Sequence, residues 1–202
     1  MSILTLSTSL ITLAATITLA QPYIPTLSTS LFSWHPVLMA LFFWSTITAS
    51  VLLKQKSPST LLYHALLQVV AVVAITAGFV VEYYNKDLNK RAHFTSWHGV
   101  LGGTATLLCL VVALFGDAVY WFPKAVFGSL VKARKWYEVK KYAGTFATLI
   151  SVIAGVIGVN AYASVDQNVK LGISGVLTLT TLLLIVIPSS VPAKKVKNDK
   201  DN

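Results

Sequence analysis

Long apolar runs alternate with short polar segments along this chain. Each run approaches the length of about 20 residues that a helix needs to cross the apolar core of a bilayer. Helices are the expected form, because a lipid-exposed backbone must satisfy its own hydrogen bonds and runs this long are unlike barrel strands. The pattern therefore predicts an all-α integral membrane protein with six transmembrane helices. The six runs lie at 3–21, 36–53, 61–81, 97–116, 141–162 and 171–188.

Polar segments connect these predicted helices, and the longest of them is 117–140. Residues 1–188 are expected to form one membrane domain, and residues 189–202, which end in AKKVKNDKDN, are expected to form a polar tail. No soluble domain is predicted. The other connections are 22–34, 54–60, 82–96 and 163–170.

Composition supports the membrane assignment. Of the 202 residues, 55% are hydrophobic and 11% are charged, and the mean hydropathy is +0.70. A soluble domain is about a quarter charged. The net charge of +9 comes from basic residues in short loops, which describes topology rather than nucleic-acid binding, so no nucleic-acid partner is expected. Cys109 is the only cysteine, so the chain cannot form an intrachain disulfide.

The distribution of Lys and Arg indicates the orientation. If the N-terminus is cytoplasmic, twelve basic residues lie on the cytoplasmic side and four on the other, which favours cytoplasmic termini at both ends. The alternative for the first run is a signal peptide cut after Ala20, although this run lacks a basic segment. In both cases the run 36–53 begins on the outer side. The four outer basic residues are Lys86, Lys90, Arg91 and Lys170.

Three of the four histidines stand where predicted helices begin. His35 and His98 begin helices from the outer side, and His64 begins one from the inner side. Two imidazoles at similar depth on neighbouring helices can hold a planar metal macrocycle, and imidazole is a common haem ligand. The alternative is that each histidine only bridges lipid headgroups and water. Ionisable groups within membrane helices are nevertheless candidates for function.

Glycines accompany two of the candidate positions. Gly102 lies one helical turn after His98, and Gly144 lies one turn after Lys140. A missing side chain at these places lets a flat ring approach the backbone. Small residues also suit close helix crossings, so packing is the competing explanation.

Three segments resemble the cytochrome b561 family, in particular its short type, the cytochrome b561 domain-containing proteins. SLFSWHPVLM at 30–39 resembles the second-helix signature, HALLQ at 64–68 the third-helix motif, and HFTSWHGVLGG at 93–103 the fourth-helix motif. The resemblance covers roughly residues 30–190. It implies a six-helix bundle whose central four helices, about 35–162, hold two b haems.

The resemblance also implies roles for individual residues. His35 and His98 would be the axial ligands of the outer haem, and His64 would be one ligand of the inner haem. Ascorbate would be the cytoplasmic electron donor. The acceptor across the membrane would be the monodehydroascorbate radical or ferric iron.

The fifth predicted helix departs from the family pattern of a histidine followed four residues later by glycine. VKKYAGTFATLI at 139–150 places Lys140 where the histidine is expected. Three alternatives follow. Lys140 ligates the iron as a neutral amine, His64 alone holds a five-coordinate haem, or the inner site is empty and Lys140 extends to the interface.

Substrate residues are expected on both sides. Basic residues of the inner side would attract anionic ascorbate, although the positive-inside rule places lysines there whatever the function. On the outer side, His93, Phe94 and Trp97 are expected to border an acceptor pocket, where His93 coordinates ferric iron or relays a proton. The alternative for His93 is a solvated loop histidine. The inner candidates are Lys54, Lys56, Lys132, Arg134 and Lys135.

These observations favour a haem-b transmembrane oxidoreductase. The alternative is a non-enzymatic or one-sided membrane protein with a single haem and a degenerate inner site. A small-solute transporter is disfavoured because few polar side chains fall at mid-span. By resemblance, the membrane is that of the endoplasmic reticulum or a vesicle rather than the plasma membrane. Glycine-rich faces are compatible with a homodimer.

Overall fold

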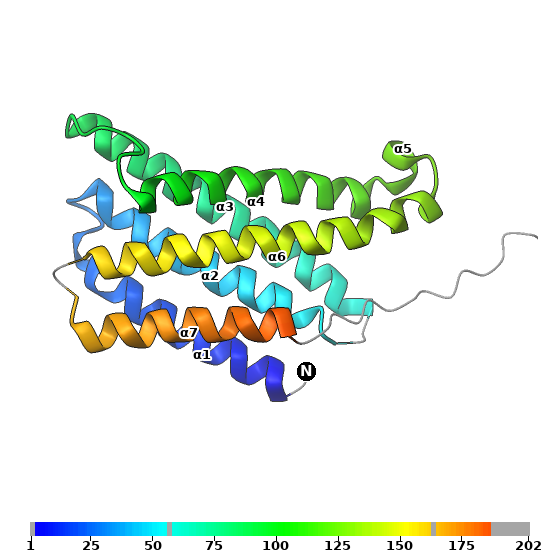
Figure 1. Cartoon of the computed structure of the whole chain (residues 1–202), viewed down its shortest axis with the longest axis horizontal. Coiled ribbons are helices and arrows are strands. Elements are labelled where there is room, and N and C mark those ends of the chain that lie inside the picture. Colours follow the sequence, from blue (N-terminus) through cyan, green and yellow to red (C-terminus); the bar gives the residue numbers. More distant parts are fainter. Residues whose placement is uncertain (1–2, 56–57, 163–164, 187–202) are drawn as a thin grey trace, which may run out of the picture.

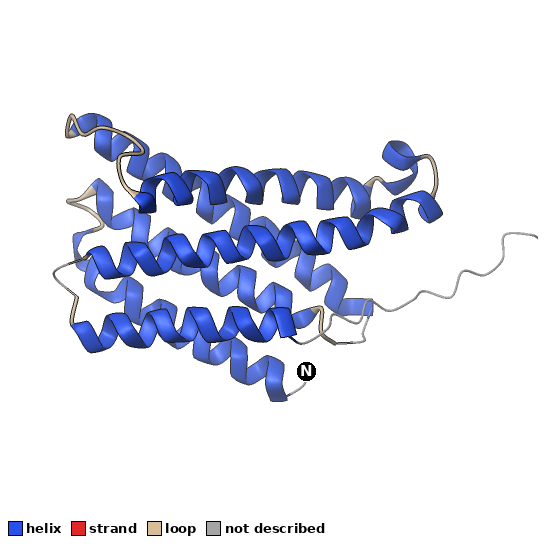
Figure 2. Ribbon diagram, in the orientation of Figure 1, coloured by secondary structure: helices blue, strands red, loops and turns tan. Residues whose placement is uncertain are grey.

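The computed structural model describes residues 3–55, 58–162 and 165–186, and the described residues contain helices but no strand (Figures 1 and 2). The predicted all-α class is confirmed. The predicted tail, 189–202, lies outside the described residues. The helices are α1 (Ile3–Ala20), η1 (Gln21–Thr26), η2 (Leu31–Ser33), α2 (Trp34–Leu52), α3 (Pro58–Leu88), α4 (Trp97–Trp121), α5 (Pro123–Phe127), α6 (Leu130–Ala161) and α7 (Gln167–Val186).

Five helices of the described chain are long and apolar enough to cross a bilayer, so the protein is a multi-pass integral membrane protein. α1, with 18 residues, is not one of these five helices; it packs along α2 and α7. The five candidate spans are Leu31–Leu52, Ser59–Leu88, Trp97–Trp121, Leu130–Ala161 and Gln167–Val186.

Helices α3, α4 and α6 are longer than the apolar runs that predicted them. The predicted connection 117–140 was wrong in this respect, because α4 continues to Trp121 and α6 begins at Leu130, with α5 between them. Segments such as VKARKWYEVKK are rich in good helix formers, so the helix continues beyond the apolar run. The 32 residues of α6 extend over about 48 Å, more than the roughly 30 Å of an apolar bilayer core.

The helices form two antiparallel pairs, α2 with α3 and α4 with α6, and α3 also packs on α4. α1 and α7 pack on each other, with α1 beside α2 and α7 beside α6. α2, α4 and α7 begin at one end of the bundle, which we call the His35 end. α1, α3 and α6 begin at the other, the His64 end, where α7 stops (Figure 1).

The core lies mainly along α2, where Phe42 and Ile47 are almost fully buried. Thr12 and Thr16 of α1 are also buried, and their hydroxyls bond within the helix: Thr12 Oγ1 donates to the Thr8 carbonyl at 2.8 Å and Thr16 Oγ1 to the Leu13 carbonyl at 3.0 Å. Because these hydroxyls already have hydrogen-bond partners within the helix, α1 can bury them against its neighbouring helices. The arrangement leaves the bundle hollow at the His35 end.

Candidate functional site

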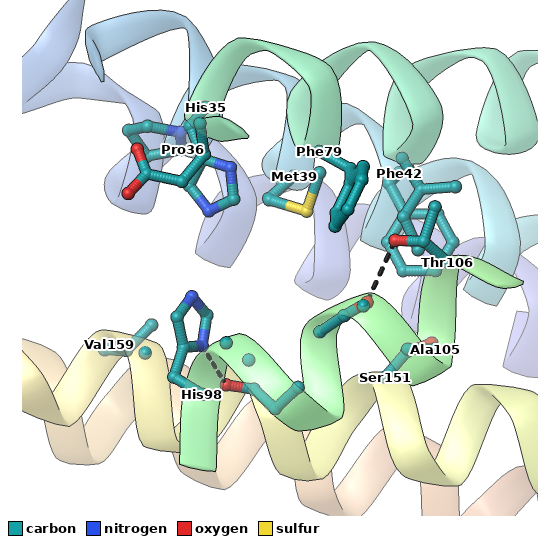
Figure 3. A pocket seen from close by; sticks show the side chains of 18 of the residues that line it. His35, Pro36, Met39, Phe42, Phe79, His98, Ala105, Thr106, Ser151 and Val159 are labelled. Carbon is teal, nitrogen blue, oxygen red and sulfur yellow. Dashed lines mark hydrogen bonds between the residues drawn. The ribbon is translucent and has the colours of Figure 1, made fainter. Parts of the chain in front are cut away.

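A cavity opens between α2, α3, α4 and α6 at the His35 end. Its empty volume is about 1060 Å³, part of it open to the surface. Apolar and aromatic side chains form most of its wall, among them Met39, Phe42 and Phe79 (Figure 3). The remaining lining includes two imidazoles and, at the mouth of the cavity, a small group of charged side chains. Such a cavity suits a large, flat and mainly apolar ligand.

His35 and His98 face each other across this cavity (Figure 3). Their ring centres lie 6.0 Å apart and the rings are nearly perpendicular, at 85°. A metal held between two imidazoles separates the ring centres by about 6 Å, since each metal–nitrogen bond is about 2 Å and each ring adds about 1 Å. The structure therefore brings His35 and His98 together at the same end of the bundle, with their rings facing each other.

Each of these imidazoles bonds to a backbone carbonyl of a neighbouring helix. His35 Nδ1 donates to the Gly78 carbonyl of α3, and His98 Nδ1 donates to the Ala154 carbonyl of α6, both at 2.9 Å. A carbonyl only accepts, so the proton stands on Nδ1 and the lone pair on Nε2. This is the arrangement that orients metal-binding histidines in proteins.

The local sequence places both histidines in first turns of helices. Pro36 lies in the first turn of α2, where the N–H that proline lacks has no partner within the helix. Ser96 caps α4, because its Oγ accepts a bond from the Gly99 N–H at 3.2 Å. His98 therefore stands two residues inside a well-defined helix start.

Glycines shape the wall around the imidazoles. A Cβ at Gly158 would lie 2.6 Å from His98 Cε1, so the ring rests on bare backbone. A Cβ at Gly102 would meet nothing within 4 Å, and Gly102 lines the cavity, so the space beside it is open. A Cβ at Gly144 would lie 3.7 Å from Val112 Cγ1 of α4, an ordinary van der Waals contact, and Gly144 does not line the cavity.

The mouth of the cavity holds the charged set. His93 Nε2 pairs with Asp87 Oδ1 at 2.8 Å, and the His93 ring stacks on Tyr83 with centres 3.9 Å apart. His93 is therefore a partly buried, paired side chain rather than a freely solvated one. His93 and Phe94 line the cavity, whereas Trp97 is 75% exposed and does not.

At the opposite end, His64 is buried and its Nδ1 donates to the Ala49 carbonyl of α2 at 2.9 Å. The Lys140 side chain of α6 lies against Gly116 of α4: a Cβ at Gly116 would be 2.5 Å from Lys140 Cε. Lys140 is also close enough to His64 for an electrostatic interaction. Both side chains thus belong to the interior of the His64 end.

The predicted substrate lysines of the inner side differ in their exposure and in their contacts. Lys54 Nζ donates to the Leu184 carbonyl at 2.8 Å, in the last turn of α7. Burial and the charge of Lys141 lower the pKa of Lys54. Lys132 and Lys135 are exposed in the first turns of α6. Lys56 lies outside the described residues, as does the side chain of Arg134, whose backbone belongs to α6.

Sequence reasoning missed two tyrosines and three carbonyls. Tyr23 and Tyr162 line the cavity and pack edge-to-face, with ring centres 5.8 Å apart. Burial raises the pKa of both phenols. The carbonyls of Gly78, Ala154 and Ala49 bind the histidines, and no side chain marks them. Of the glycines that line this cavity, only Gly102 on α4 was predicted from the sequence to lie beside a ligand.

Comparison with known proteins gives a consistent set of matches. The family model described as eukaryotic cytochrome b561 matches residues 34–166. Transmembrane reductase CYB561D2 of Bos taurus is 34% identical over 87 residues, and that of Homo sapiens 35% over 89 residues; each match covers 39% of this chain and of the relative. Probable transmembrane reductase CYB561D1 of Mus musculus is 31% identical over 97 residues, which are 44% of this chain and 42% of the relative.

The matched segments thus span about two fifths of the length of each curated relative. No solved structure matches the chain.

Proposed function

Because this chain belongs to the eukaryotic cytochrome b561 family, we propose that it is a haem-b oxidoreductase of a membrane. It passes electrons from cytoplasmic ascorbate to an acceptor on the other side, either the monodehydroascorbate radical or ferric iron. The observation that carries this proposal is the His35–His98 pair, whose ring centres stand 6.0 Å apart across the cavity.

The residues around the pair fit a haem b. Both Nε2 atoms remain available because both Nδ1 atoms donate to carbonyls, and these bonds make the imidazoles better electron donors to a metal. The glycine wall and aromatic lining accept a flat macrocycle, and Lys86 at the mouth suits the carboxylates at its edge. A bound haem b supplies a one-electron iron couple.

The mouth is the proposed place of the outer acceptor. His93 and Phe94 stand there, and the Asp87 carboxylate and the Tyr83 ring hold the His93 imidazole in position. In this role His93 coordinates ferric iron or relays a proton to the reduced radical. Glu82 and Lys86 belong to the same lining, so the mouth carries one carboxylate and one ammonium group beside His93.

The proposed topology counts α1 as a sixth span and treats residues 1–188 as one domain. Helices α2, α3, α4 and α6 form its haem-binding core. The His64 end and both termini face the cytoplasm, with residues 189–202 as a polar cytoplasmic tail. The endoplasmic reticulum or a vesicle is the proposed membrane, and a homodimer the proposed assembly.

The test is electron transfer across a sealed vesicle. Purified protein is reconstituted with ascorbate trapped inside, and reduction of a membrane-impermeant ferric chelate is followed outside. We expect reduction faster than in protein-free vesicles, with the ascorbate-reduced haem spectrum appearing first. A protein without haem overturns the proposal. A protein with haem but no transfer supports the single-haem, one-sided alternative instead.

The basic start of α6 provides a further prediction. Replacing Lys132 and Lys135 together with glutamate is expected to slow haem reduction by ascorbate about tenfold at low ionic strength, because both exposed charges attract the anion. Stopped-flow absorbance measures this rate, and the difference should shrink as salt is added.

Arg91→Glu, a single charge reversal at the His35 end, is the control and should leave this rate unchanged. An equal effect from Arg91→Glu, or none from the double variant at any salt concentration, would place the ascorbate site elsewhere.

A further inference from the structure

The last three turns of α3 place two charged side chains on the face that holds the His35 imidazole. The Gly78 carbonyl accepts from His35 Nδ1 at 2.9 Å, and Glu82 and Lys86 follow Gly78 by four and eight residues. Residues four apart lie on one face of a helix. Both charged side chains line the cavity. A carboxylate and an ammonium group therefore stand on the wall beside His35.

Two asparagines hold the Glu82 carboxylate in position. Asn85 Nδ2 donates to Glu82 Oε2 at 3.0 Å. The Asn85 amide is itself oriented, because its Oδ1 accepts from Asn89 Nδ2 at 3.2 Å. An amide whose oxygen already accepts a hydrogen bond presents its N–H to the carboxylate, so the two bonds form a relay along α3. The carboxylate is thus a fixed feature of the cavity wall.

The charge of Glu82 reaches across the cavity. Glu82 and Lys86 are both close enough to His35 for an electrostatic interaction, and the two act with opposite sign. Of the two, Glu82 acts on the ring more strongly. Glu82 also interacts with Tyr162, which follows the end of α6. The carboxylate therefore acts on the walls contributed by α2 and α6 as well as on its own helix.

A fixed charge beside a redox centre changes its reduction potential. Iron gains one electron on reduction, so a nearby negative charge favours the ferric form over the ferrous form and lowers the potential. A positive charge has the opposite effect. Both effects are larger in an apolar cavity than in water, because the effective dielectric constant is lower there.

We propose that Glu82, held by Asn85, lowers the reduction potential of the haem at the His35–His98 site. This inference rests on the proposed function, which supplies the haem. Glu82 is a positioning residue in this role, because it acts through its charge and not as a ligand. A lower potential makes the iron a stronger reductant of the outer acceptor, and Lys86 opposes the effect in part.

The test is a redox titration of the purified full-length protein, followed by absorbance. Haem per chain and the low-spin ferric signal in electron paramagnetic resonance first show that the site is loaded, and His98→Ala identifies the transition that belongs to it. Glu82→Gln removes the charge but keeps an oxygen that accepts from Asn85. We expect the ratio of ferrous to ferric iron at a fixed potential to rise about tenfold, a shift of about 59 mV for a one-electron couple.

Two further variants separate the charge from general effects. Lys86→Gln removes the opposing charge and should lower the potential, whereas a loosened α3 would not shift the two variants in opposite directions. Asp166→Asn removes an exposed carboxylate at the start of α7, at the same end of the bundle. Asp166 Oδ1 accepts from the Asn168 N–H at 2.8 Å, and the asparagine oxygen can accept the same bond, so the potential should not change.

The outcomes distinguish this inference from the proposed function. A loaded Glu82→Gln protein whose potential is unchanged or lowered, or shifts no more than that of Asp166→Asn, overturns the inference and leaves the haem site in place. If Glu82→Gln binds no haem, Lys86→Gln decides, because an unchanged or raised potential in that variant also overturns the inference. A wild-type protein without haem overturns the proposed function as well.

Discussion

Replacing His98 with alanine is expected to abolish haem binding at the His35 end and to stop electron transfer across the vesicle. In the proposed site this imidazole is one of the two iron donors across the cavity, and its Nδ1 bond to the Ala154 carbonyl holds the ring in position. Haem per chain and the low-spin signal measure the loss. His35→Ala should give the same result, because either variant leaves one donor.

The matched control is His93→Ala, which removes the other histidine of the same end. His93 is held by Asp87 and Tyr83 at the mouth, so this variant should keep its haem. If His93→Ala lost haem as completely as His98→Ala, the choice of ligands would be wrong.

The second large effect is expected from filling the cavity at Gly102. A Cβ there meets nothing within 4 Å, so Gly102→Leu places its side chain into the cavity without a backbone collision. Leucine also has a higher helix propensity than glycine, so α4 should not be weakened. The added side chain takes space that the macrocycle needs. A cost of about 1–3 kcal/mol lowers haem affinity about 5- to 150-fold, measured by haem titration of the haem-depleted protein.

Gly175→Leu is the control for Gly102→Leu. Gly175 lies exposed on α7, and a Cβ there also meets nothing within 4 Å. The same substitution should leave haem affinity unchanged at this position. Equal affinity in both variants would mean that no ligand occupies the space beside Gly102.

Hydropathy predicted the helices because it reports the segment that lies in lipid. It could not predict where α6 begins, since the charged start of that helix, Leu130 to Lys141, has helix propensity but no apolar run. The equal depth of His35 and His98 was predictable because both residues stand at helix starts on the same side of the bundle. Phe94 and His93 were predictable as neighbours of His98 in sequence.

The carbonyl partners were not predictable in the same way. Gly78 and Ala154 act through their backbones, so their side chains carry no signal for the role. Tyr162 reaches the cavity only because α6 ends beside Tyr23, a tertiary relation between residues far apart in the chain. Such relations depend on which helices are neighbours, and a run of hydropathy values does not contain that information.

The two histidine–carbonyl bonds between α2 and α3 also fix how these helices slide along each other. A shift of a single residue, about 1.5 Å along the axis, would misalign both bonds at once. The two bonds lie about four helical turns apart, so each one keeps the helices aligned for the other. The axial register of α2 and α3 therefore depends on these two backbone-directed bonds as well as on side-chain packing.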